Sequence, residues 1–190
     1  MRGEQRALPN GVHSSFGRSW RRGLDVTPAT LLNNNGGITM TTANKAQDAI
    51  TLLTAQHREV HEMFEKFENM TDRAKVSKKK LADEICQALI MHTTIEEEIL
   101  YPAVREATEE TEDMVDEAVV EHASAKDLIA QIQEMDPGDD LYDAKVKVLG
   151  ELVDHHVEEE EKEMFPKMKE LKLDLKALGE EMAARAAELQ

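Results

Sequence analysis

Apolar residues recur at helical spacing from about residue 44 to the end of the chain, and they divide it into five helical segments. Four longer segments run over about 44–69, 77–107, 111–135 and 140–171, and a shorter one covers about 173–189. The apolar residues of each longer segment form a single stripe, as in a helix with one face toward a core. Because the connections are short, we predict an all-α fold: an antiparallel, up-down-up-down four-helix bundle with a short C-terminal fifth helix.

Turn-forming residues mark the breaks between and within these segments. Residues 136–140 read Asp-Pro-Gly-Asp-Asp and predict a loop whose aspartate caps the next helix. Pro102 lies inside the second segment and predicts a kink or local break near Ile99. Pro166 lies near the end of the fourth segment.

The first forty residues lack hydrophobic periodicity and differ in charge from the rest. They hold five arginines against two acidic residues, a net charge of +3. Three readings stay open: a disordered leader over 1–43, a transit peptide, or translation that begins at Met40. Disorder or a later start is favoured. We expect the bundle over 44–171 and the C-terminal helix over 172–190.

Composition excludes several functional classes. Aromatic residues make up 4% and charged residues 33% of the chain, which favours helices over sheets. The formal net charge of −16 argues against nucleic acid and anionic membrane surfaces as partners. No apolar run approaches the roughly 18 residues of a membrane span. Cys86 is the single cysteine, which fits a cytoplasmic location; it is most simply a buried apolar residue.

Each of the four apolar stripes carries a histidine where a leucine would be expected. These are His57, His92, His122 and His156. On two stripes a glutamate follows one turn later, Glu96 after His92 and Glu160 after His156. A single core histidine is usually just hydrogen-bonded, but four helices with the same substitution need a common cause, because buried polar groups must be paired or bound to metal.

The second and fourth segments are pseudo-repeats. Residues 92–102 and 156–166 both follow the pattern H-x-x-x-E-E-x-x-x-aromatic-P. His57 precedes His92 by 35 residues, and His122 precedes His156 by 34. The chain therefore reads as two helical hairpins related by an internal twofold, each of which brings two histidines and one glutamate to the centre.

This residue set predicts a paired-metal site. A histidine and a glutamate at i and i+4 share a helix face, so that the imidazole can bind one ion and the carboxylate can bridge two. Four histidines and two glutamates without a thiolate disfavour structural zinc and suit Fe, Mn or Co. A set richer in histidine than most di-iron carboxylate bundles points to reversible ligand binding rather than strong oxidation.

These motifs resemble the hemerythrin-like, or HHE cation-binding, family over about residues 45–170. The resemblance rests on the two repeats above, together with Gln56-His57 and Glu121-His122. It implies two iron ions, oxo- or hydroxo-bridged, with Glu96 and Glu160 between them and the four histidines around them. It also implies binding of dioxygen, or sensing of oxygen, iron or oxidants.

The sequence departs from oxygen-carrying hemerythrins at one position. Those proteins have five histidine ligands, two of them at i and i+4 on the third helix, where this chain has Lys126. His61, one turn after His57, and Tyr101 are candidates for the missing ligand. His155 with Glu159 offers an alternative register to His156 with Glu160, although the repeat favours the latter. Glu97 and Glu161 could accept hydrogen bonds from the imidazoles.

Three functions compete at this stage. The leading hypothesis is a di-iron protein that binds dioxygen or a small oxidant for storage, delivery or sensing. The second is a di-iron enzyme that acts on peroxide or ferrous iron, since the Lys126 departure would leave an open position. The third is an interaction protein in which the metal only stabilises the bundle. A monomer or a small homo-oligomer is expected.

Overall fold

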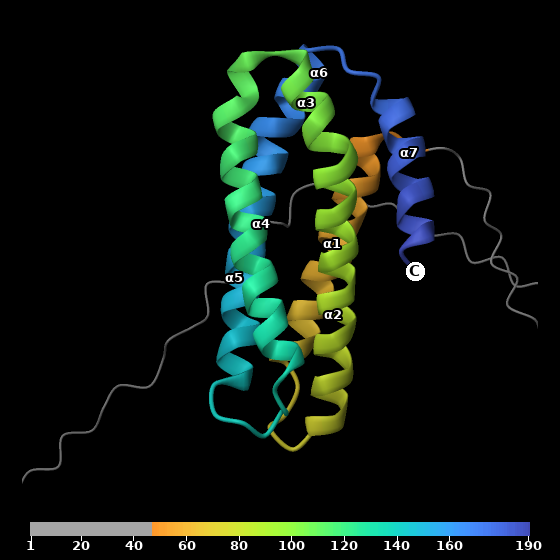
Figure 1. Cartoon of the computed structure of the whole chain (residues 1–190). Helices are drawn as coiled ribbons and strands as arrows, with labels where there is room; N and C mark the ends of the chain where they lie inside the picture. The colour runs from red at the N-terminus through yellow and green to blue at the C-terminus, as the bar shows by residue number, and fades with distance from the viewer. Residues whose placement is uncertain (1–46) are drawn as a thin grey trace, which may run out of the picture. The chain divides into compact units, whose positions relative to one another are not determined.

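The computed structural model describes residues 47–190. The predicted leader, 1–43, and the beginning of the first predicted segment lie outside the described residues. Within 47–190 all regular structure is helical (Figure 1). None of the helices in this range is long and apolar enough to cross a membrane.

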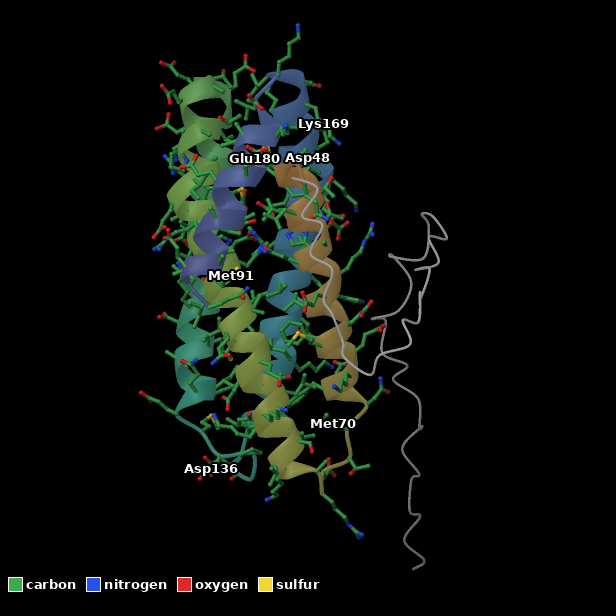
Figure 2. All side chains as sticks on the ribbon, turned by 90° about the vertical axis from the view of Figure 1, so that its right-hand side faces the viewer. Asp48, Met70, Met91, Asp136, Lys169 and Glu180 are labelled. Atoms are coloured by element: carbon green, nitrogen blue, oxygen red, sulfur yellow. The ribbon has the colours of Figure 1, made fainter. Side chains whose placement is uncertain are left out.

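Four long helices form the bundle. They are α1 (Ala49–Glu68), α2 (Lys75–Ile95), α4 (Glu112–Gln133) and α5 (Tyr142–Glu159). The helix α1 packs against α2 and α5, and α4 packs against the same two helices, so neighbours along the chain are neighbours in space. Figure 2 places the turns around Met70 and Asp136 at one end of the bundle and Lys169 at the other. The predicted antiparallel four-helix bundle is confirmed.

Both α2 and α5 continue through one wide turn into a short further helix. The π-helical turn η1 (Glu96–Leu100) leads into α3 (Tyr101–Ala107), and η3 (Glu160–Met164) leads into α6 (Phe165–Glu170). In each, the backbone N–H of the aromatic residue donates to the glutamate carbonyl five residues earlier. The next residue is proline, which has no N–H and would clash with the carbonyl four residues back in a regular helix. The break predicted near Ile99 is this π turn.

Short elements complete the chain. A 3₁₀ turn, η2 (Glu109–Thr111), leads into α4, and α7 (Leu175–Glu188) is the predicted fifth helix. Asp48 caps α1 by accepting from the Thr51 N–H at 2.9 Å. The predicted capping aspartate before α5 is wrong: Leu141 holds that position in the left-handed region, with φ 72°. Asp139 instead accepts from the Asp136 N–H, which stabilises the loop itself.

The core consists of two apolar clusters, one on each side of the histidine layer. One cluster contains residues such as Phe64, Ile85, Ile129 and Leu149. The other contains residues such as Leu53, Ile95, Val115 and Met168. Burial of this apolar area stabilises the bundle at about 25 cal/mol per Å². The layer between the clusters is polar and buried.

The helix α7 is fixed to the bundle by close backbone contact. It packs against α1, α2 and η1. A Cβ added at Gly179 would lie 2.2 Å from the Gln47 carbonyl oxygen and 2.6 Å from the Ala49 nitrogen, so only glycine fits there. Figure 2 shows the neighbouring Glu180 beside Asp48 at the start of α1. Arg185 also pairs with Glu98 of η1, with 2.6 Å between Nε and Oε2.

We expect Gly179→Ala to lower the free energy of unfolding by about 1–3 kcal/mol, because backbone atoms cannot move aside for the new methyl group. Urea unfolding followed by circular dichroism measures this difference. Glu180→Ala, next to it and exposed, is the control and should stay within about 0.5 kcal/mol of the unchanged protein. Equal stability of the two variants would contradict the proposed close packing of α7.

Candidate metal centre

Six polar side chains meet between the two apolar clusters. Each of the four long helices contributes one histidine, and each π turn begins with one glutamate; all six are at most 7% exposed. They are His57, His92, His122, His156, Glu96 and Glu160. These are the six residues that the sequence predicted to come together. His155, the alternative to His156, is exposed on the outside of α5.

The six side chains fall into two groups that share a glutamate. Ligand atoms of His57, His92, Glu96 and Glu160 lie within 4.8 Å of one another, and so do those of Glu96, His122 and His156. Residues of the first hairpin dominate one group, and the histidines of the second hairpin form the other. The six residues thus form two candidate cation-binding groups joined by Glu96.

Each carboxylate contacts one histidine from each hairpin. Glu96 Oε1 lies 3.1 Å from His92 Nε2, and its Oε2 lies 3.4 Å from His122 Nε2. Glu160 Oε2 lies 3.4 Å from His57 Nε2 and 3.9 Å from His156 Nε2. The two carboxylates therefore occupy the positions between the half-sites.

The outer nitrogen of every imidazole is held by a side-chain oxygen. Within each hairpin, the second histidine donates to the residue that precedes the first. Nδ1 of His92 donates to Gln56 at 2.8 Å, and Nδ1 of His156 donates to Glu121 at 2.8 Å. Across the bundle, Nδ1 of His57 donates to Glu161 at 3.0 Å, and Nδ1 of His122 donates to Glu97 at 2.9 Å.

These four contacts fix the tautomer of the imidazoles. An amide or carboxylate oxygen only accepts, so the Nδ1 proton is committed outward and the Nε2 lone pair points to the centre. The roles expected for Glu97 and Glu161 agree with these contacts. The sequence pattern does not mark Gln56 and Glu121 as acceptors, although each directly precedes a central histidine, His57 or His122.

The centre contains buried polar atoms that the protein does not satisfy. In the described part of the chain, His57 Nε2 and all four oxygens of Glu96 and Glu160 are buried without a hydrogen-bond partner. Leaving such atoms unpaired costs about 1–3 kcal/mol each. Nitrogen and oxygen lone pairs that converge without donors fit a cation.

Burial and mutual repulsion shift the pKa values of the central groups. Burial and the neighbouring histidines lower the pKa of His92 well below its usual value and that of His122 to about 4. Burial and the facing Glu160 raise the pKa of Glu96. Burial opposes the charged form of His57, but contacts with Glu160 and Glu161 outweigh it and raise its pKa. Without a cation, these shifts favour a protonated Glu96 carboxyl, neutral His92 and His122, and a charged His57 beside the Glu160 carboxylate, whose pKa His57 lowers.

The π turns place one aromatic side chain over each half-site. The i→i+5 hydrogen bond that closes each turn joins the aromatic residue to the glutamate five residues earlier, Tyr101 to Glu96 and Phe165 to Glu160. The Tyr101 hydroxyl lies 3.2 Å from His122 Nε2. Phe165 stacks on His57 instead, with 6.0 Å between ring centroids. At this position the two halves therefore differ by one hydroxyl group.

His61 and Lys126 occupy equivalent positions one turn after His57 and His122, and both point away from the centre. Lys126 Nζ lies 2.7 Å from each oxygen of Glu97. His61 Nδ1 lies 3.3 Å from Asp154 Oδ1 on α5. Neither residue belongs to the two central groups. Of the two candidates for the missing ligand, Tyr101 is the one that reaches the centre.

A small apolar cavity adjoins the histidine layer. It has a volume of about 50 Å³. All four histidines reach its wall, and the rest of the lining is largely aliphatic, including Val60, Leu89, Ala125, Val153 and Val157. A cavity of this size and polarity suits a small, uncharged molecule next to the polar centre.

The sequence of the chain is similar to that of a known family of cation-binding domains, in agreement with this arrangement. The model of the hemerythrin HHE cation binding domain matches residues 48–168, which is more than half of the chain. The chain belongs to the hemerythrin HHE cation-binding family. The resemblance seen in the sequence is confirmed, and with it a helical bundle that carries a buried His/Glu metal-binding cluster.

Two known proteins are also similar to this chain. A crystal structure of a hemerythrin HHE cation binding domain-containing protein from Mycobacterium kansasii superposes with a TM-score of 0.65 at 25% identity, over 75% of this chain and 87% of that one. A protein named DNA nickase from Nostoc sp. is 26% identical over 148 residues. The match covers 77% of this chain but only 40% of that relative.

We expect Glu96→Gln to make the chelated, metal-free protein more stable at pH 7, by about 1–3 kcal/mol. The pKa of Glu96 is raised in the folded state, so its contribution to stability is fully present below the unfolded pKa of 4.5 and is lost as the pH rises. The gain should therefore disappear near and below pH 4.5. Urea unfolding across pH 4–8 measures it.

Glu98→Gln is the matched control for this measurement. Glu98 lies two residues away but pairs with Arg185 at the surface, which lowers its pKa. Its replacement should leave stability at pH 7 unchanged or slightly lower. A loss of stability for Glu96→Gln in the metal-free protein would contradict the unsatisfied state of this carboxylate.

Proposed function

We propose that this protein holds two iron ions, one by His57 and His92 and the other by His122 and His156. Glu96 and Glu160 lie between them. The observation that carries the proposal is that each carboxylate contacts one histidine of each hairpin. A donor set of nitrogen and oxygen atoms without thiolate supports iron over structural zinc.

The protein's role on this proposal is to bind dioxygen or a related small oxidant, for storage, delivery or sensing. A bound ferrous pair supplies the electrons for such a ligand. The protein supplies the aliphatic cavity against the histidines, which favours an apolar diatomic molecule over water. Glu97 and Glu161 hold the imidazoles in the orientation that leaves Nε2 unprotonated.

The activity named for the Nostoc relative is not carried over. That protein is much longer than the matched region, which is 40% of its length. The net charge of −16 on this chain opposes contact with a phosphate backbone. The central residues are also too deeply buried to reach a DNA strand.

We expect the protein to bind two irons after anaerobic addition of Fe²⁺ and to develop the absorption bands of an oxo-bridged ferric pair on exposure to air. Glu160→Ala and His156→Ala should lose both properties, because each removes a donor from the centre. Metal analysis and optical spectroscopy provide the readout. His155→Ala, which removes the adjacent exposed imidazole, is the control and should retain two irons. A protein that stays colourless and iron-free would refute the di-iron proposal.

The second candidate is a di-iron enzyme that acts on peroxide or ferrous iron. The observation that favours it is the Tyr101 hydroxyl, 3.2 Å from His122 Nε2 in the half-site where Lys126 replaces a histidine. Burial and the surrounding carboxylates raise the pKa of Tyr101, so the phenol stays protonated in the absence of a cation. It can then donate a proton toward the centre or give it up to become a ligand.

Tyr101→Phe tests this residue, and Phe165 in the other half shows that the fold accepts phenylalanine there. If Tyr101 binds iron, the loaded protein should lose a visible phenolate-to-iron band in the variant while it keeps both irons. If Tyr101 acts as a proton donor, catalytic peroxide decay should slow by about 10²-fold or more. An unchanged spectrum together with an unchanged rate would exclude both roles. Unfolding on iron removal, with neither oxygen binding nor turnover, would favour a purely structural metal.

A further inference from the structure

A second polar feature of the bundle leads from the surface to the buried centre. A groove of about 290 Å³ runs along α4 on one side and α5 with η3 on the other. Most of its lining is acidic: Glu110, Asp113, Glu117, Glu121, Glu159 and Glu163. Clustered carboxylates with low-dielectric walls raise the local concentration of cations.

The floor of this groove is formed by the centre itself. Glu160 and His156 both line it. Glu160 is only 2% exposed, and neither of its oxygens has a hydrogen-bond partner. An unsatisfied, buried carboxylate at the end of an acidic groove is a position that a cation would fill.

Three ligand atoms converge at the rim. Glu121, His155 and Glu159 bring one donor each within 4.8 Å of one another. His155 Nε2 lies 3.5 Å from Glu121 Oε1 and 3.4 Å from Glu159 Oε1. The other oxygen of Glu121 accepts from His156 Nδ1 at 2.8 Å. One carboxylate thus touches both the rim and the centre.

The rim cluster is not a by-product of the internal repeat. The positions in the first hairpin that correspond to Glu121, His155 and Glu159 are Gln56, Met91 and Ile95. Gln56 Nε2 donates to Met91 Sδ there, at 3.8 Å. That side carries neither a carboxylate nor an imidazole at these three positions, so the described part of the first hairpin has no counterpart of the rim cluster.

We propose that Glu121, His155 and Glu159 form a divalent-cation site at the rim of this groove, and that ferrous ion is captured there and passes along the groove to Glu160 and His156. The rim site stands on its own geometry, whereas its role as an entry point rests on the proposed di-iron function. Two carboxylates and one imidazole form a weak, open site, which suits an ion that has to leave again.

The first test is a titration of the metal-free protein with Co²⁺ without oxygen, by equilibrium dialysis and visible absorption. We expect two tight equivalents and one weaker equivalent per chain. His155→Ala and Glu159→Gln should lose the weaker one and keep the tight ones. Glu158→Gln is the matched control: it removes the same charge from the adjacent position, which is paired with Lys162 outside the groove. Absence of a weaker equivalent, or its persistence in both rim variants, overturns the rim site.

The second test is the rate at which Fe²⁺ fills the centre, measured by stopped flow. Electrostatic capture raises association rates by about 10–10³-fold, so Glu159→Gln should load about tenfold more slowly and depend less on salt. His155→Ala removes a ligand but no carboxylate, so it should load more slowly with an unchanged salt dependence. The final iron content of both variants should equal that of the unchanged protein. Loading at an unchanged rate refutes the entry role.

The titration separates this proposal from the di-iron proposal. If the unchanged protein takes up no tight equivalents, the di-iron proposal fails. In that case a weaker equivalent that is present in the unchanged protein and lost in His155→Ala still supports the rim site. If the tight equivalents form and the weaker one is absent, the rim site fails while the di-iron proposal stands.

Discussion

The structure depends on a layer of buried nitrogen and oxygen atoms that outnumber their hydrogen-bond donors, enclosed between two apolar clusters. Four imidazoles point Nε2 inward because each Nδ1 is held by an outer oxygen, and the two glutamates add oxygens that no donor reaches. Such a layer is unfavourable in a protein interior unless positive charge enters it. The four helices, their two-hairpin arrangement and the outer acceptors all keep this layer in place.

Much of this layer could be predicted from the sequence, because a polar residue on an apolar stripe is conspicuous. His57, His92, His122 and His156 interrupt such stripes, and the repeat of His-xxx-Glu with its aromatic-Pro ending related the two hairpins. The bundle followed from helical periodicity, and the meeting of the six side chains from periodicity together with this repeat. That these six ligate metal stays a prediction.

Other features depend on geometry that periodicity does not contain. Gln56 and Glu121 look like flanking polar residues until the helices pack and bring each beside the histidine of its hairpin partner. The expected break at Pro102 left its form open, and the π turn decides that Tyr101 faces the centre. His61 and Tyr101 were both candidates in the sequence, but His61 turns toward Asp154. Direction of a side chain near the edge of a stripe follows from packing, which the pattern does not encode.

The difference between Tyr101 and Phe165 has a consequence for anything that binds at the centre. The backbone around the centre is nearly symmetric, but the two sets of donors are not equivalent. The half with His122 and His156 has a phenol at 3.2 Å and the Glu121 carboxylate behind an imidazole, whereas the half with His57 and His92 has a benzene ring and the neutral amide of Gln56. The side chains therefore break the pseudo-twofold of the helices, and two cations held here would meet unlike surroundings.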